Sequence, residues 1–237
     1  ISIGLVGSEM CIRDRPIMLQ SKLCVLNGMS PTMLKEMGEC KHDQGGYFIV
    51  DGSEKVIVSH ERKAENKLYI VESNDGVNVL SAQIKSVPED SFKFARTTVV
   101  NLKENGEFMV RLPMLPHQIP LFVLFRLLGV ESDKDILKYI LYNLETEKSR
   151  MFLEDLEASV VNTGPIFTQM DALRYVANLT KGNTISHILD ILKTDLFPHV
   201  GTDYVEKAYY LGYCVNKILC VKHGLDKPTD RDSFMYK

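Results

Sequence analysis

The hydrophobic pattern between residues 43 and 62 predicts a β-hairpin. The run from Tyr47 to Val50 is apolar at every position, which predicts a strand that is covered on both faces. Asp51 and Gly52 follow, and glycine supplies the positive φ that a tight turn needs. A second strand is expected from about Lys55 to Ser59. The period of two then places the lysine at its start on a sheet face that is otherwise apolar.

Three further elements are predicted around this hairpin. Pro16 to Cys24 has the apolar and β-branched content of a short strand, and Ser30 with Pro31 marks the start of a short helix. Leu68 to Val71 reads as another strand. The turn formers from Ser73 to Gly76 then mark the first domain boundary.

The next segment predicts a second hairpin and a buried helix. Residues 97–102 and 107–112 flank Asn105-Gly106, which is a strong hairpin signal. A helix is expected from Pro120 to Leu128, apolar nearly all round except for Arg126. This arginine is expected to be structural and to reach a carboxylate, a carbonyl or solvent, and a nucleic-acid contact is the alternative.

The remainder is predicted to be a helical bundle. Three N-terminal caps followed by an acidic residue precede periodic apolar positions: Ser132 with Asp135, Thr168 with Asp171, and Asp203 with Glu206. The last of these helices carries four tyrosines at helical spacing, which favours packing over a base-stacking platform: Tyr204, Tyr209, Tyr210 and Tyr213.

Composition narrows the class of protein. The chain has 237 residues, of which 45% are hydrophobic and 25% charged, and this is typical of one or two globular domains. A net charge of −3 argues against a free-standing nucleic-acid binder. Five cysteines without a C-x-x-C pair indicate reduced thiols. Residues 1–15 match neither a signal peptide nor a membrane helix, and we expect a non-native or disordered leader.

The sequence offers little catalytic chemistry. It has no phosphate-binding glycine loop, no nucleophile elbow and no zinc-protease motif. Cys40 and His42 lack the second pair of ligands that a zinc site needs. Asp230 and Asp232 could contribute to a Mg²⁺ site, but Arg231 between them favours ion pairing at a domain junction. We therefore assign no catalytic residue and no metal ligand.

A series of motifs resembles the second-largest, beta-type subunit of multisubunit DNA-directed RNA polymerases. The longest motif comprises Glu39-Cys40, Asp43, Gly45 to Ile49, Gly52 to Val56 and Glu61-Arg62. Further anchors follow in the family's order: Ile119-Pro120, Phe125-Arg126, Leu128-Gly129, Phe197-Pro198-His199, Leu211-Gly212-Tyr213, Asp230-Arg231-Asp232 and Phe234. The resemblance begins at Pro16 and is of the eukaryotic, archaeal or large-DNA-virus type.

This resemblance implies an α+β fragment of a much longer subunit. Residues 16–72 would be part of the protrusion domain, residues 73–228 the lobe, and residues 229–237 the start of a return to the protrusion. The implied role is a cleft wall that positions DNA and the RNA–DNA hybrid, with Mg²⁺ bound elsewhere in the whole enzyme. The implied partners are the largest subunit, small subunits and initiation factors, in the nucleus or in a viral factory or virion, with no membrane.

The resemblance also gives two candidate nucleic-acid contacts, Lys55 and the weaker Arg62. The alternative for Lys55 is an edge lysine that prevents aggregation or extends to water. The rival to the polymerase function is an independent protein-interaction module without enzymatic activity, which the acidic net charge favours.

Overall fold

A computed structural model describes residues 15–73, 76–89, 94–180, 184–230 and 232–236. Its contacts divide the chain into two compact units, one from Ile1 to Glu61 and one from Arg62 to Tyr236. Helices and antiparallel sheets occur together, so the predicted α+β class is confirmed. No helix within these described ranges is long and apolar enough to cross a membrane.

The predicted hairpin is present in the first unit. Strands β1 (Phe48–Val50) and β2 (Ser53–Lys55) pair antiparallel, and the two turn residues between them both have positive φ, as in a type I′ turn. The first strand is not covered on both faces as predicted, since Ile49 and Val50 are exposed. The second strand was predicted from about Lys55 to Ser59 but ends at Lys55, because Phe48 opposite Lys55 is the last pair. The preceding residue, Tyr47, uses its carbonyl oxygen to accept from the N–H of Leu19 at 2.9 Å. Residues 56–58 therefore continue as exposed chain.

The segment before the hairpin is folded as turns. The strand predicted from Pro16 to Cys24 is wrong: the N–H of Ser21 donates to the carbonyl of Met18, and the N–H of Cys24 donates to that of Ser21. Leu19 does pair with Gly46 and Tyr47, but the donors of Ser21 and Cys24 are used within the segment, so the pairing does not continue as a strand ladder. The predicted helix start is confirmed, since the Ser30 hydroxyl caps α1 (Pro31–Glu36).

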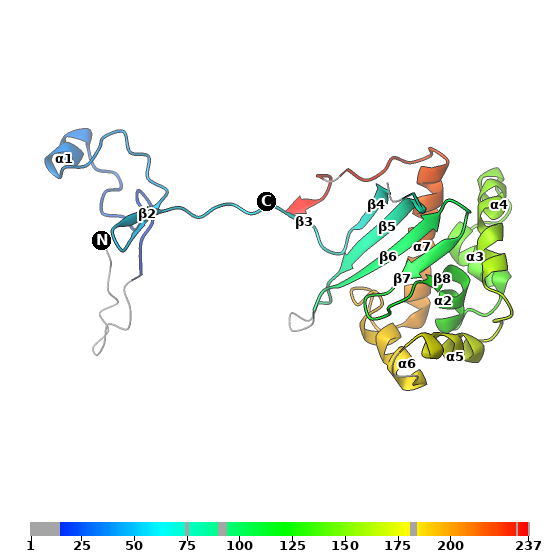
Figure 1. The fold of residues 1–237 in the computed structure, drawn as a ribbon. Coiled ribbons are helices and arrows are strands. Elements are labelled where there is room, and N and C mark those ends of the chain that lie inside the picture. The colour runs from blue at the N-terminus through cyan, green and yellow to red at the C-terminus, as the bar shows by residue number, and fades with distance from the viewer. Residues whose placement is uncertain (1–14, 74–75, 90–93, 181–183, 231, 237) are drawn as a thin grey trace. The chain divides into compact units, whose positions relative to one another are not determined.

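The second unit is built on a five-stranded antiparallel sheet (Figure 1). The strands follow chain order: β4 (Leu68–Glu72), β5 (Asn78–Ser86), β6 (Arg96–Lys103), β7 (Phe108–Arg111) and β8 (Ile119–Pro120). The predicted hairpin at Asn105-Gly106 is confirmed by the pairing of Leu102 with Phe108. The predicted boundary after residue 72 falls between β4 and β5, and β4 pairs with β5 along its whole length. The structure divides the chain at residues 61 and 62 instead.

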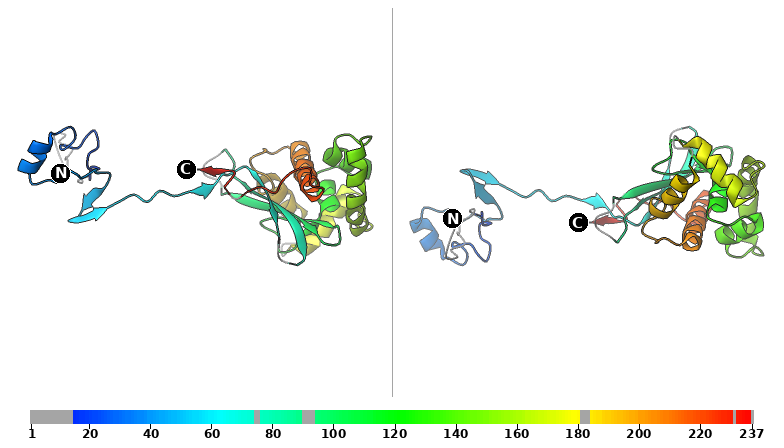
Figure 2. Two further views of the ribbon diagram at one scale, coloured as in Figure 1. Left: turned by 90° about the horizontal axis from the view of Figure 1, so that it is seen from above. Right: turned by 90° about the horizontal axis from the view of Figure 1, so that it is seen from below.

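Helices gather on one face of this sheet (Figure 2). Their bounds are α2 (Leu121–Leu127), α3 (Asp133–Leu141), α4 (Glu147–Asn162), α5 (Gln169–Leu179), α6 (Ile185–Thr194) and α7 (Tyr204–Lys222). Helix α7 packs on β4, β5 and β6, and α2 packs on β7 and β8. The core lies between these layers, with Phe108, Val110, Leu211 and Ile218 fully buried. Helix α4 was not among the predicted helices.

The caps of these helices follow the sequence with one exception. Thr168 accepts from the N–H of Asp171, and Asp203 accepts from the N–H of Val205. Ser132 does occupy the N-cap of α3, but its side chain makes no capping bond, and the Asp135 carboxylate pairs with Lys138 at 2.7 Å. The two residues of the predicted capping box are therefore in place at α3, but the capping hydrogen bond of Ser132 is not formed.

The two ends of the second unit pair with each other. β3 (Arg62–Lys63) and β9 (Met235–Tyr236) form a two-stranded antiparallel sheet. Thr229 reinforces this closure: its N–H donates to the carbonyl of Ile70 at 2.8 Å, and its hydroxyl accepts from the N–H of Ile70 at 3.1 Å. The chain therefore enters and leaves this unit at the same edge of its sheet.

Candidate nucleic-acid interface

Lys55 is the last residue of β2 and is solvent-exposed. Its cross-strand neighbour is Phe48, while Glu54 lies opposite Ile49, so lysine and glutamate extend from opposite faces of the hairpin. No ion pair to Lys55 occurs within the described ranges of the chain. The cation is thus fixed at its Cα by the turn and the strand, and its ammonium group is open to a partner.

The corner before the hairpin explains several motif residues. The carboxylate of Asp43 accepts from the N–H of Gly45 at 2.9 Å and from the hydroxyl of Tyr47 at 2.6 Å. This hydrogen bond to Asp43 raises the pKa of Tyr47 to about 12. Gly45 has a φ of 69°, and a Cβ there would lie 2.5 Å from the carbonyl oxygen of Leu19. Only glycine fits, and the corner sets the direction from which the hairpin starts.

Arg62 lies in the second unit, on β3, with its side chain 68% exposed. Its guanidinium lies 3.7 Å from the carboxylate of Glu65, and Lys85 lies closer to the same oxygen, at 2.9 Å. The hydrogen bond from Lys85 is the main cause of the lowered pKa of Glu65, and Arg62 adds to it. Arg62 is therefore only loosely held at this carboxylate.

Further cations surround Arg62, and the sequence analysis did not identify them. The basic cluster comprises Arg62, Lys63, Lys67 and Lys85. Lys63 and Lys67 were visible as a charge-rich run, but Lys85 joins them only through the register of β4 and β5. That register depends on strand pairing, which no local pattern reveals.

Two aromatic rings hold two members of this cluster, Lys63 and Lys67. The ammonium of Lys63 lies 5.4 Å from the ring centre of Tyr69, and that of Lys67 lies 5.8 Å from the ring centre of Phe234. The two rings meet edge to face at 5.9 Å, and the hydroxyl of Tyr69 donates to the carbonyl of Phe234 at 2.7 Å. Cations held over aromatic rings keep fixed positions while remaining accessible to a phosphate.

The acidic pair and the buried arginine have different surroundings. Asp230 and Asp232 are exposed near the end of the chain, and Arg231 between them lies outside the described residues. Within the described residues no group of three or more histidine, cysteine, aspartate or glutamate side chains could hold a metal ion. Arg126 is 2% exposed and pairs with Asp133 at 2.5 Å, as the structural interpretation predicted.

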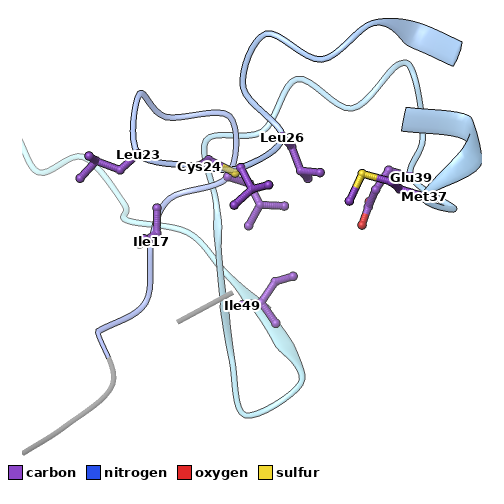
Figure 3. Close-up of a pocket in the computed structure, with 9 residues that line it drawn as sticks. Ile17, Leu23, Cys24, Leu26, Met37, Glu39 and Ile49 are labelled. Atoms are coloured by element: carbon purple, nitrogen blue, oxygen red, sulfur yellow. The ribbon is translucent and has the colours of Figure 1, made fainter. Parts of the chain in front are cut away.

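The first unit also contains an apolar pocket of about 190 Å³ (Figure 3). Its walls come from the turns before α1, from the end of α1 and from β1, and they include Ile17, Leu26, Met37 and Ile49. Leu26 and Leu34 are the buried apolar side chains of the unit's described part, and many others are exposed. The pocket brings together no acid–base pair and offers surface for packing.

Comparison with known proteins shows the family to which this chain belongs. A family model described as RNA polymerase beta subunit matches residues 6–208. The chain belongs to the RNA polymerase beta subunit family. The match begins at residue 6, so it includes residues 6–15 of the leader, for which the sequence analysis expected no resemblance.

The relatives of this beta subunit chain are eukaryotic and archaeal. It is 38% identical over 230 residues to the DNA-directed RNA polymerase II subunit RPB2 of Encephalitozoon cuniculi, and 33% identical over 239 residues to RNA polymerase II subunit 2 of Arabidopsis thaliana; each alignment covers 92% of the chain. It is also 32% identical, over 97% of its length, to subunit Rpo2 of Saccharolobus solfataricus. The chain spans 20% of the length of each of these relatives.

Proposed function

We propose that this chain forms part of the second-largest subunit of a DNA-directed RNA polymerase and supplies a wall that positions nucleic acid without taking part in the chemistry. The observation that carries the proposal is the similarity to polymerase subunits over more than nine-tenths of the chain. The surface supports it, because cations are presented on short strands, Lys55 on β2 and Arg62 with Lys63 on β3.

The contacts that we propose are electrostatic. Lys55 in the first unit, and Arg62 with its basic cluster in the second, would each face phosphates of DNA or of the RNA–DNA hybrid. Such contacts release counterions and carry no base specificity, which suits an enzyme that transcribes every sequence. The net charge of −3 is compatible with this role because the local balance around Glu65 is positive: two cations, Arg62 and Lys85, share that one carboxylate.

The domain assignment follows from the paired ends of the second unit. We propose that residues 62–236 are the lobe and that the preceding residues belong to the protrusion, which moves the predicted boundary from residue 72 to residue 61. A domain whose first and last strands pair can be inserted into another domain without separating that domain's flanking segments. A fragment of residues 62–236 should then unfold cooperatively by itself, whereas residues 73–228, which lack β3, β4 and β9, should not.

The other parts of the proposal concern the whole enzyme. Mg²⁺ would be bound outside this chain, and the partners would be the largest subunit, small subunits, DNA, the RNA–DNA hybrid and initiation factors. We place the protein in the nucleus, since two of the relatives named above are RNA polymerase II subunits. None of the relatives named here is viral, so the viral location has no support among them.

Co-purification tests the proposal against the rival of an independent interaction module. The tagged chain should be expressed in a eukaryotic cell within the full-length subunit and, separately, alone. We expect the full-length form to elute with a largest polymerase subunit and with RNA-synthesising activity. If the full-length form eluted without a largest subunit, the polymerase proposal would be wrong. If the chain alone bound an unrelated protein stoichiometrically, the rival would be favoured.

A further inference from the structure

A groove lined by tyrosines lies where α3 and α7 cross. It is open to solvent, and the residues that matter for its chemistry are Glu131, Asp135, Lys138, Tyr139, Tyr142 and Tyr209. We call it the tyrosine groove. It belongs to the second unit and shares no residue with the basic cluster around Arg62.

The aromatic side chains of the groove are unusually exposed. Tyr142 is 57% exposed and Tyr209 is 55% exposed. The rings of Tyr139 and Tyr209 lie 4.5 Å apart at an angle of 54°, so that they form a tilted wall. The predicted packing role therefore fits Tyr210, which contacts Phe197 at 5.0 Å, better than Tyr209. Exposed aromatic groups beside a hollow favour a binding surface.

Tyr142 is held in a strained backbone conformation. It has φ 63° and ψ −50°, and the N–H of Asn143 donates to the carbonyl of Leu141 at 2.7 Å. These values describe a γ-turn with positive φ, a conformation that is rare and costly for any residue with a Cβ. Glycine would adopt it more easily. A tyrosine at this position therefore lowers the stability of the fold. Because its ring is exposed, burial of the ring offsets little of that loss.

The groove has a fixed negative charge. One carboxylate oxygen of Glu131 accepts from the N–H of Gln169 at 2.9 Å, which fixes the side chain at the rim. Among the described residues, no cation pairs with this carboxylate. Asp135 pairs with Lys138 at 2.7 Å, but both side chains are half exposed, and such a pair exchanges partners at little cost.

We propose that the tyrosine groove binds an arginine side chain presented by a peptide segment of another protein. A guanidinium group can lie flat against the exposed ring of Tyr209, which stands beside that of Tyr139, while its N–H groups donate to the free oxygen of Glu131; Tyr142 lines the same groove. Arginine fits this combination better than lysine because it is planar and donates in a fork. The carboxylates disfavour a phosphate backbone at the same place. The proposal does not depend on the nucleic-acid contacts proposed above.

The test compares two peptides on the intact 237-residue chain. One is an acetylated and amidated heptapeptide with arginine between two runs of three alanines, and the other carries citrulline, which has the same shape without the charge. In an amide NMR titration at low salt, the arginine peptide should shift the resonances of residues 129–142 and 205–213 in a saturable way. The citrulline peptide should produce shifts at least fivefold smaller.

Variants separate binding from folding. Glu131→Gln and Tyr209→Ala should each weaken the arginine peptide at least fivefold, whereas Tyr175→Ala, at a partly exposed tyrosine on α5, should leave it unchanged. Tyr142→Gly should weaken binding and keep or raise the melting temperature, a combination that a purely structural tyrosine would not give. Equal shifts with both peptides, no shifts, or stronger shifts with a ten-nucleotide single strand would each overturn the proposal.

Discussion

Gly212 of α7 lies directly against the backbone of Tyr139 of α3. A Cβ atom on Gly212 would be 2.3 Å from the carbonyl oxygen of Tyr139 and 2.7 Å from its carbonyl carbon. These are main-chain atoms of a helix and cannot rotate away. The glycine therefore sets the distance between the two helices, and the position of α3 in turn sets the wall of the tyrosine groove.

Gly212→Ala should destabilise the second unit by about 2 kcal/mol or more, because the helices must separate to admit the methyl group. The direction of this change in stability is informative, since alanine is normally about 1 kcal/mol more favourable than glycine inside a helix. Urea denaturation of the chain measures the change. Gly224→Ala is the matched control: it follows the end of the same helix, has open space around it and a φ of 67°, and should cost only about 1 kcal/mol.

The ion pair between Arg126 and Asp133 predicts an asymmetry. The arginine is 2% exposed, the side chain of Asp133 is 42% exposed, and two guanidinium nitrogens have no partner among the described residues. Asp133→Ala should cost about 3 kcal/mol because it leaves a buried charge unpaired. Arg126→Met should cost less than about 1 kcal/mol, since the freed carboxylate is solvated. Equal losses in chemical denaturation would contradict this explanation, and Asp135→Ala is the exposed control.

Local patterns were sufficient for those parts of the fold that local chemistry determines. Asp51-Gly52 and Asn105-Gly106 each require a tight turn, and both turns were predicted correctly, although the strand after the first turn lies at Ser53–Lys55 and not at residues 55–59. The strand from Pro16 to Cys24 was wrong because apolar content shows that a segment can be buried and does not show that a partner strand is beside it. Helix α4 was missed although Thr146 caps it by accepting from the N–H of Ser149.

The candidate site was less accessible to prediction. Lys55 and Arg62 came from a resemblance, and they remain predictions. Lys85 joins Arg62 through Glu65 only because β4 and β5 pair in one particular register. Tyr139 and Tyr209 come together through the crossing of two helices, and positions so far apart in the sequence give no sign of that contact.

Acid should weaken the second unit before its carboxylates titrate. His199 lies among Ser86, whose hydroxyl is 2.7 Å from Nδ1, the edge of Tyr210 and the buried Lys207. Burial, and then the charge of Lys207, lower the pKa of His199 below 6.5. In the window just below pH 6.5 the unfolded chain then binds the proton and the folded chain does not.

The free energy of unfolding should therefore fall as the pH is lowered from 7.5 to 5. His199→Gln should flatten this dependence, because the glutamine has no proton to gain in that range. Urea denaturation at several pH values measures the slope. An unchanged slope in the variant would assign the acid sensitivity to another group, and His117→Gln, at an exposed histidine, is the control.

Lys55 gives the most direct test of the proposed wall. Its ammonium has no ion-pair partner within the described ranges, and β2 fixes its backbone, so a phosphate contact would add an interaction without breaking one. In the full-length polymerase, Lys55→Ala should weaken the elongation complex by on the order of 1 kcal/mol, equally on all templates, and reduce the salt slope by about one. Lys22→Ala, at an exposed lysine of the same unit, should change neither. If Lys55→Ala instead left the lifetime and salt dependence of the complex unchanged and lowered its melting temperature, the lysine would be the structural edge residue that the sequence also allowed.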